Sequence, residues 1–447
     1  MTASIPKKCF GSLGLALEEG LNLTNITESQ FGIGTPRTAF PWNLSGTYVQ
    51  VIPYIYSVDE NGSEHNFLAD YYRTTQELAS NVFRKGYQWP FHATRTLEFG
   101  SSLVDMAIAK EQTLGRKVFM DFQRNPAPVP GDLLFSLSRL DDDVRAYLEN
   151  NDALAALPIE RLRQMNPLSI SLYKMHGNDL ETTPLQFAMN NQHMNGGIEV
   201  DVWGQTSLPG CHAVGEVSGT HGVTRPGGAA LNAGQVFAVR AARYIGGAGR
   251  RTKSDDRADI AKPVLNNINQ IIRQALDNSN GTGLREVRND IQNRMSDYAG
   301  FLCSAEAIAL AREQADTLRE KVYAGGLKIG HVAEVSELFM WRHLALTSAA
   351  VLTVLEQYVR EGGGSRGARI ILDEEGACVP QIRNGLCEEW RFRPEREEDK
   401  HHRMVIKFSD GEFTVNKQSL RTMPDTRKLY FEKNWPDFLT GKIYEKS

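Results

Sequence analysis

The sequence predicts an α+β protein of several domains that ends in a helical bundle and a small β-rich tail. Strand-like alternation in RKVFMDF (116–122), and again in MVIKFSDGEFTV (404–415) around Asp410-Gly411, indicates sheet and a hairpin. A different spacing in LREVRNDIQNRMSDY (284–298) puts its apolar residues on one helical face. At 447 residues, with about 150 residues per domain, about three domains are expected.

Composition excludes several classes of protein. The net charge is −4 with no basic stripe, so a nucleic-acid partner is not expected. No run of apolar residues looks long enough to span a bilayer, which takes roughly 20 residues, and the N-terminus does not resemble a signal peptide. The five cysteines are scattered, which predicts neither a disulfide framework nor a metal site. A cytoplasmic protein is therefore expected.

The remaining elements follow from periodicity and from breaks in it. A short helix closed by Gly20 is expected over 11–23, and two strands joined by a turn over 196–217. An Ala- and Val-rich helix over 228–245 is of the kind that packs against a sheet. The polar stretch 246–259 reads as a linker. Further helical segments are expected at 101–115, 140–182, 284–302, 302–323 and 332–360.

The most informative stretch is the glycine-rich loop GEVSGTHGVTRPGG (215–228). Gly227 and Gly228 stand directly before a helix N-terminus, where a flat ligand can approach backbone N–H groups and the positive end of the helix dipole. Glu216 can accept hydrogen bonds from hydroxyl groups, and Arg225, the sole cation in the loop, can clamp a carboxylate. The alternative is a tight strand-to-helix turn whose glycines only permit close packing.

Four segments in order carry a family resemblance. GCHAVGEVSGTHGVTRPGGAALNAGQVFAVRAA (210–242) resembles the second FAD-binding segment of the succinate dehydrogenase, fumarate reductase and L-aspartate oxidase flavoproteins, A-x-G-E followed by H-G-x-x-R-x-G-(G/S)-x-x-L. HMNGGIEVD (193–201) resembles the family's M-G-G-I-x-x-D, and 101–122 resembles its cap helix and strand. REVRNDIQNRMSDYAGFL, followed at a distance by SRGAR (365–369), resembles its C-terminal helical domain. The resemblance covers about residues 10–370.

The resemblance implies a partial FAD-binding domain with an inserted α+β substrate cap domain, a C-terminal helical bundle and a small β-rich tail. The implied domains are a FAD-domain segment at 1–30, the cap at 31–190, a second FAD-binding segment at 191–250, a helical domain at 258–361 and a tail domain at 362–447. It implies FAD as the cofactor and these FAD-binding residues: Gly215, Glu216, Gly227, Gly228, Ala230 and Leu231.

One departure concerns the cofactor. Family members begin with a βαβ unit whose G-x-G-x-x-G turn holds the FAD pyrophosphate. No such unit is seen before Gly11, and the literal match GGGSRG (362–367) follows a helix and opens none, so it is a chance match. We therefore expect a second polypeptide to supply the Rossmann portion. An iron–sulfur electron-transfer protein is a further candidate partner, and the substrate is a small organic molecule.

Other departures concern the substrate. Gly32 stands in place of the family histidine of Q-(F/Y)-H-P-T, and Thr47-Tyr48 in place of its T-E pair. Ser101 and Ser102 replace the proton-delivering arginine before the cap helix. The histidine of H-Y-x-M-G-G aligns with Gln192, with His193 one place away. These changes predict a substrate other than succinate or fumarate.

The candidate site is drawn from the positions that keep a useful side chain. The candidate catalytic residues are Arg225, His221, His193, Tyr48 and Arg95, and the candidate substrate-binding residues are Thr47, Arg225 and Gln192. His92 is a further candidate in the cap. For the cap candidates Arg95, His92 and Tyr48, the alternative is an ordinary surface or packing residue.

The expected function is hydride transfer between flavin N5 and an organic substrate, with a side chain handling the proton. The alternative is a flavin-free scaffold or regulatory subunit descended from the same fold, supported by the lost substrate ligands. A non-redox use of bound FAD is a third possibility for which the sequence offers nothing specific.

Overall fold

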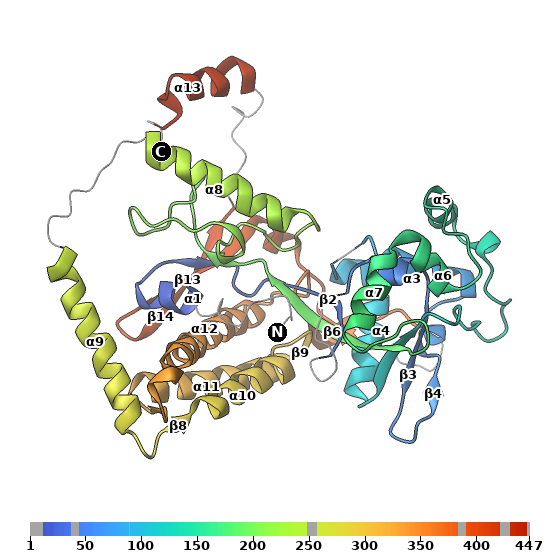
Figure 1. Ribbon diagram of the computed structural model, residues 1–447, viewed down its shortest axis with the longest axis horizontal. Coiled ribbons are helices and arrows are strands. Elements are labelled where there is room, and N and C mark those ends of the chain that lie inside the picture. The colour runs from blue at the N-terminus through green and yellow to red at the C-terminus, as the bar shows by residue number, and fades with distance from the viewer. Residues whose placement is uncertain are drawn as a thin grey trace.

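The computed structural model describes residues 12–36, 44–88, 90–247, 257–382, 390–420 and 430–444. Figure 1 shows two lobes joined by the long strand β6 (Leu185–Met194), which runs from the centre of the molecule into the smaller lobe. The smaller lobe holds α3 to α7 and the larger one holds α8 to α12. The candidate site lies at the end of β6 that faces the larger lobe.

The smaller lobe is an antiparallel sheet covered by helices. Its strand order is β2-β6-β5-β3-β4, with β2 at Ser29–Gly34, β5 at Lys117–Asp121, β3 at Tyr54–Val58 and β4 at Glu64–His65. Its helices are α2 (Thr47–Gln50), α3 (Thr75–Lys85), α4 (Ser102–Thr113), α5 (Asp142–Asn150), α6 (Pro158–Met165) and α7 (Pro167–Met175). The Thr74 side chain caps α3 by accepting from the Glu77 N–H, and Pro158 and Pro167 start α6 and α7. The helices expected at 101–115 and 140–182 are thus present.

The larger lobe contains a second antiparallel sheet, of order β14-β13-β1-β7. Its strands are β14 (Glu412–Ser419), β13 (His402–Ser409), β1 (Leu23–Thr24) and β7 (Gly197–Ile198). β13 and β14 form the expected hairpin, whose turn residues Asp410 and Gly411 have φ of 54° and 85°. Helix α1 (Ser12–Glu18) is the expected first helix, closed by Gly20 at φ 70°.

The helical bundle is built around α12 (Val335–Arg360), against which α10 (Leu284–Asp297) and α11 (Ala305–Tyr323) pack. Leu284, Val287 and Ile291 are buried, so the predicted apolar face of α10 is confirmed. Short strands link the bundle to the tail: β9 (Leu302–Cys303), β11 (Ile370–Cys378) and β12 (Arg391–Phe392) form one sheet, and β8 (Thr282–Gly283) pairs with β10 (Leu327–Lys328). Among the described residues one helix, Val332–Arg360, is long and apolar enough to cross a membrane, contrary to the sequence expectation. Since 61% of its most apolar window is buried, α12 serves as the core of the bundle.

Three helices lie at the periphery. α8 (Ala229–Gly247) contacts the turn η4 (Gly215–Val217) but buries only Ala241 and Tyr244 within the described structure. Within the described residues, α8 therefore does not pack against a sheet, and that expectation is wrong. Figure 1 shows α9 (Arg257–Asp277), which falls within the region implied to be the helical domain, at the outer edge of the bundle. The helix α13 (Trp435–Leu439), which lies beyond α8, was not expected from the sequence. Of the expected linker, 248–256 lies outside the described residues.

Two further expectations need correction. Between Ile198 and Gly215 the chain forms turns and isolated bridges instead of two strands, because the Asp201 carboxylate accepts from the backbone N–H groups of Trp203 and Gln205. The tail is not a unit apart, because β13 pairs with β1 and β11 pairs with β9.

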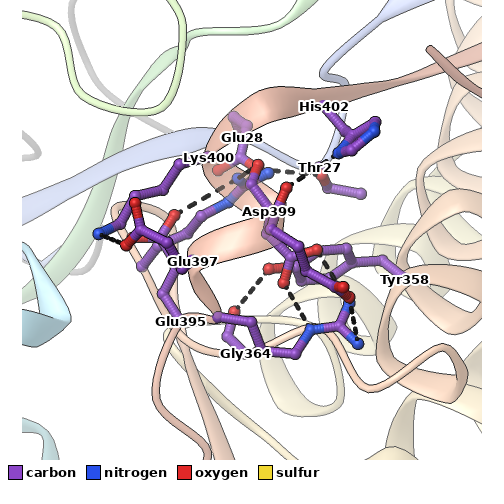
Figure 2. Close-up of polar contacts among 12 residues, drawn as sticks. Thr27, Glu28, Tyr358, Gly364, Glu395, Glu397, Asp399, Lys400 and His402 are labelled. Carbon is purple, nitrogen blue, oxygen red and sulfur yellow. Dashed lines mark hydrogen bonds and ion pairs between the residues drawn. The ribbon is translucent and has the colours of Figure 1, made fainter. Parts of the chain in front are cut away.

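A buried ionic network connects the tail to Glu28, directly before β2 (Figure 2). The Arg366 guanidinium donates to Oε1 of Glu28, with 2.5 Å from Nη2, and lies 3.5 Å from the Glu395 carboxylate. Glu28, Glu395 and Asp399 gather at this network in Figure 2, and Arg396 makes two hydrogen bonds to Asp399. The Glu28 backbone carbonyl in turn accepts from the Asn195 N–H at 3.0 Å. The network therefore supports the segment that follows His193 and leads into β7.

Candidate active site

Three ionisable side chains form a hydrogen-bonded row where β6 meets the glycine-rich loop. His193, near the end of β6, places Nδ1 at 3.2 Å from Oε2 of Glu216 and Nε2 at 3.0 Å from Nδ1 of His221. The two imidazole centroids are 4.8 Å apart. The second oxygen of Glu216 accepts from the Met194 N–H at 3.0 Å, so both carboxylate oxygens are engaged. We call these three residues the Glu-His-His row.

The row is held by its surroundings. His193 is 7% exposed and pairs in register with Gln30 of the neighbouring strand β2. Burial raises the pKa of Glu216, but the hydrogen bonds from His193 and Met194 outweigh it, so the net shift is downward and the carboxylate stays ionised. Burial, with the nearby charges of His193 and Arg225, lowers the pKa of His221 to about 4, against an opposing effect of Glu216. His221 is therefore neutral near pH 7.

Arg225 lies beside the row and is 8% exposed. Its Nη1 donates to the carbonyl oxygens of Pro226 at 3.0 Å and Gly227 at 2.7 Å, so one edge of the guanidinium braces the loop. Its Nε is buried and has no hydrogen-bond partner in the part of the chain that the structure describes. An arginine has five N–H donors, so the bracing leaves donors for a ligand.

Several other buried polar atoms near the loop lack partners. Asn195, which is fully buried, donates to the Val223 carbonyl at 2.9 Å while its Oδ1 has no partner among the described residues. The same holds for these atoms on the loop and on β2: His221 Nε2, Thr224 Oγ1 and Gln30 Oε1. Since leaving a buried polar group unpaired costs roughly 1–3 kcal/mol, such a group of atoms is the mark of a site that a ligand completes.

The glycines of the loop leave open space beside the start of α8. Gly215 and Gly222 have φ of 80° and 66°, which only glycine adopts without strain. A Cβ built on Gly227 or Gly228 would meet nothing within 4 Å. Ala229, the first residue of α8, follows directly, and Leu231 is 80% exposed. The N-terminal end of α8, including Ala230, is therefore accessible to a ligand.

The structure does not bring the other candidates to this row. The hydroxyl of Tyr48 donates to the Ser169 carbonyl in the core of the smaller lobe, where burial raises the pKa of Tyr48 to about 12. Arg95 donates to the carbonyl oxygens of Gln88 and Pro90, next to α4. The hydroxyls of Thr47 and Ser45 hydrogen-bond each other on the rim of the cap. These contacts give all three residues a structural reason to be present.

The two remaining candidates are Gln192 and His92. Gln192 precedes His193 on β6 and donates to the Ile33 carbonyl at 3.1 Å, across to β2. His92 caps the turn η2 (Ala93–Thr96), and burial with the charges of Arg95 and Arg366 lowers its pKa to about 4. Neither is hydrogen-bonded to the Glu-His-His row.

Asn195, Gln30 and Gly367 belong to the site but were not candidates from the sequence. A Cβ on Gly367 would lie 2.5 Å from the Val223 carbonyl oxygen, so this glycine lets the SRGAR segment pack against the loop. Asn195 lies within the HMNGGIEVD segment and could have been noticed there. No pattern in the sequence indicates that Gln30 faces His193. Among the described residues no group of His, Cys, Asp and Glu could hold a metal ion, and the described cysteines Cys211, Cys303 and Cys378 are free.

Comparison with known proteins identifies relatives of this chain. No family model matches the sequence. The chain is 30% identical over 147 residues to a subunit of the fumarate reductase (CoM/CoB) of Methanothermobacter marburgensis, covering 33% of this chain and 26% of that protein. It is 32% identical over 151 residues to an L-aspartate oxidase of Streptomyces coelicolor, 33% of this chain and 25% of the relative. The chain is a homologue of the fumarate reductase and L-aspartate oxidase flavoproteins.

Solved structures agree at the level of the fold. The Mycobacterium smegmatis Sdh1 complex with UQ1 superposes with a TM-score of 0.62 at 16% identity, over 98% of this chain and 62% of that one. An Escherichia coli quinol fumarate reductase gives 0.60 at 17%, over 94% and 63%. An adenosine-5-phosphosulfate reductase gives 0.53 at 13%, over 91% and 61%. The chain thus shares the fold of these proteins, and it spans less than two thirds of the length of each of the relatives and structures named here.

Proposed function

We propose that this flavoprotein homologue carries the substrate cap and the flavin-facing loop of a FAD-dependent oxidoreductase. The observation that carries the proposal is the loop at 215–228, where unhindered glycines precede α8 and the buried Arg225 keeps an unpartnered Nε. The assignment of 31–190 as the substrate cap belongs to the same proposal.

The chain's residues fit one part of FAD. The isoalloxazine ring would lie over Gly227 and Gly228, with the N–H groups at the start of α8 directed to its pyrimidine edge. When bound, a flavin supplies two-electron chemistry by accepting or releasing a hydride. Glu216 fits less simply, because both of its oxygens are already hydrogen-bonded within this chain. Binding of a ribityl hydroxyl by Glu216 would have to share or displace one of these bonds.

Arg225 is the residue best placed to bind an anionic substrate group. Its guanidinium is always charged, and its orientation is fixed by the two carbonyl oxygens that it holds. The unused donors of a guanidinium can clamp a carboxylate by two parallel hydrogen bonds. The row beside Arg225 supplies groups that can exchange a proton with the same substrate.

The exposed face of α8 supports a partner that supplies the dinucleotide-binding portion. Its apolar residues with at least 48% exposure are Leu231, Val236, Val239 and Ile245. An apolar face of this kind on a helix calls for a covering element. We propose that a Rossmann-bearing polypeptide covers it, and that an iron–sulfur protein is the electron-transfer partner.

The substrate that we propose is neither succinate nor fumarate. Gly32 and Ser101 stand where the family pattern has a histidine and the proton-delivering arginine, and Gln192 is bonded to a backbone carbonyl. Each missing hydrogen bond to a substrate carboxylate costs roughly 1–3 kcal/mol, so the losses together abolish useful binding.

A flavin-free scaffold or regulatory subunit is the second candidate. The observation in its favour is the engagement of both Glu216 oxygens by His193 and Met194, so a ribityl hydroxyl would have to share an oxygen that already accepts a hydrogen bond. The unpartnered buried atoms of Arg225 and Asn195 weigh against it, because a scaffold gains nothing from them.

Flavin analysis of the assembled complex separates the two candidates. The chain is tagged, isolated with its associated proteins at low salt, and analysed for flavin by absorbance and for partners by mass spectrometry. We expect about one flavin per chain in the complex, a dinucleotide-binding partner, and no turnover of succinate or fumarate. A stable complex without flavin would show the scaffold function, and rapid turnover of fumarate would show that the cap retains the family's substrate.

A further inference from the structure

The Glu-His-His row defines which nitrogen of His221 carries a proton. The ionised Glu216 can only accept, so Nδ1 of His193 must donate to it. When His193 is neutral its Nε2 is then an acceptor, and Nδ1 of His221 must donate to it at 3.0 Å. A neutral His221 therefore carries its proton on Nδ1 and a lone pair on Nε2. Nε2 is buried and makes no hydrogen bond of ordinary geometry within the described residues.

This arrangement produces a proton acceptor and not a donor. We propose that His221 is the general base of a substrate oxidation, with His193 and Glu216 as positioning residues that fix its tautomer. The proposal rests on the proposed flavin function, and it assigns the direction of the reaction, which is oxidation of the substrate. As Nε2 takes up a proton, the Nδ1 proton can shift toward His193, and the Glu216 carboxylate stabilises the charge that develops on the row.

The groups that face His221 support this role. They are His193 from β6, Glu216 from η4, Arg225 from the loop itself and the backbone of Ala229 at the start of α8, which raises the pKa of His221 slightly against the larger effect of burial. Burial lowers the pKa of His221 to about 4, and the Arg225 guanidinium acts in the same direction, so the ring is neutral and ready to accept a proton at physiological pH. A reduction would require His221 to be protonated first, beside the Arg225 guanidinium.

The same charges select the chemical class of substrate. Arg225 favours an anionic group such as a carboxylate, and it repels an ammonium group held at the same place. A hydroxyl carries no charge and can donate its proton to the lone pair on His221 Nε2. The geometry therefore points to a 2-hydroxy carboxylate in preference to an amino acid.

The reaction balances with the bound flavin as the two-electron oxidant. When the substrate C–H bond breaks, its hydrogen would leave with both bonding electrons as a hydride, which the oxidised flavin would accept. When the substrate O–H bond breaks, its proton forms an N–H bond at Nε2 of His221. The carbinol carbon is oxidised to a ketone, so the product is a 2-oxo carboxylate.

The tautomer can be measured without turnover. In the full-length chain with ¹⁵N-labelled histidine, two-dimensional NMR at pH 8 is expected to show His221 protonated on Nδ1, the form that a free histidine side chain populates less. In His193→Phe, which removes the acceptor but keeps an aromatic ring, the proton is expected to move to Nε2. His401→Phe, at an exposed position on η6 (Glu397–His401), is the matched control and should leave His221 unchanged. Protonation of His221 on Nε2 in the unaltered chain would overturn the proposal.

Activity of the flavin-loaded complex tests the direction and the substrate class. D- and L-lactate, D- and L-malate and L-aspartate are supplied with an artificial electron acceptor. We expect oxidation of at least one hydroxy acid, and a loss of about 10²–10⁴-fold in His221→Ala at unchanged flavin content. Glu216→Gln should shift the acid limb of the rate profile to lower pH, because the carboxylate's charge raises the pKa of His221. Oxidation of L-aspartate alone, or of no compound by a flavin-containing complex, would overturn the inference, whereas a complex without flavin would overturn the proposed function itself.

Discussion

Arg225 holds the backbone of Gly227 in place, since its Nη1 donates to the Gly227 carbonyl oxygen at 2.7 Å. The same group reaches the Pro226 carbonyl at 3.0 Å, so one edge of the guanidinium fixes the turn that leads into α8. Its buried Nε is left without a partner in the described chain. Bracing of the loop and binding of a substrate anion are therefore two roles that one side chain can fill from two edges.

Substitution of Arg225 separates these roles. Arg225→Ala should reduce flavin content only in part, through the loss of the two bracing bonds. It should lower kcat/KM per bound flavin by about 10²-fold or more, because a charge-assisted contact is worth roughly 3 kcal/mol. Arg225→Lys should recover only part of the activity, since a point charge cannot replace the planar fork. The measurement is activity normalised to flavin, with Arg288→Ala on α10 as the control. Unchanged activity per flavin in Arg225→Ala would show that the residue only braces the loop.

A glycine in the first helix fixes the contact between α1 and α12. A Cβ on Gly14 would lie 2.3 Å from the carbonyl oxygen of His343. Gly14→Ala should therefore cost about 1–3 kcal/mol of the free energy of unfolding, although alanine is the better helix former. Gly246→Ala, near the end of α8 with open space around its Cβ, is the matched control and should stabilise by up to about 1 kcal/mol. Urea denaturation compares the two variants, and equal effects would contradict the close approach.

Glu18 links the same two helices electrostatically. Its carboxylate accepts from Nε of Arg342 at 3.1 Å and lies 3.0 Å from Nε2 of His343. Burial raises the pKa of Glu18, but these contacts outweigh it and the net shift is downward. The stability contributed by Glu18 is thus present above its unfolded pKa of about 4.3 and is lost as the pH falls through the lower folded value. Glu18→Gln should cost about 1–2 kcal/mol at pH 7 and progressively less at acidic pH. A difference between variant and unaltered chain that stays constant down to acidic pH would rule out this linkage.

The smaller lobe contains an ion pair that is sealed from solvent. Nζ of Lys85 lies 2.7 Å from Oδ2 of Asp105, and both side chains are 0% exposed. Removing one partner leaves a buried charge, so Asp105→Leu should cost about 3–5 kcal/mol. The double variant Lys85→Met with Asp105→Leu should regain most of that loss. Arg145→Ala, which breaks an exposed pair with Glu149, is the control and should cost less than about 1 kcal/mol. Thermal unfolding of the four proteins checks the order, and equal losses in the single and double variants would contradict it.

Local pattern was enough to predict much of the fold. The apolar spacing of α10 and the Asp410-Gly411 turn both encode their structures within a few residues, and both were predicted correctly. The expected strands at 196–217 failed because the Asp201 side chain captures backbone N–H groups, a competition that alternation does not reveal.

The candidate site was also predicted only in part. Arg225, His221, His193 and Glu216 were candidates from the sequence, and the structure brings them together. Tyr48 and Arg95 were also candidates, but their partners are the Ser169, Gln88 and Pro90 carbonyl groups. Those contacts depend on how the cap folds over long separations, which no motif in the chain records. The pairing of Gln30 with His193 is equally non-local.

The central claim is that the loop before α8 receives a flavin, and Gly228→Val tests it most directly. A Cβ on Gly228 meets nothing within 4 Å, so the substitution should leave the melting temperature and the assembly of the complex unchanged. A side chain there would obstruct a ring that lies against the backbone. We predict that flavin affinity in the Gly228→Val complex falls at least tenfold, about 1.4 kcal/mol, while Gly246→Ala leaves it unchanged. Full flavin occupancy in an intact Gly228→Val complex would contradict the account.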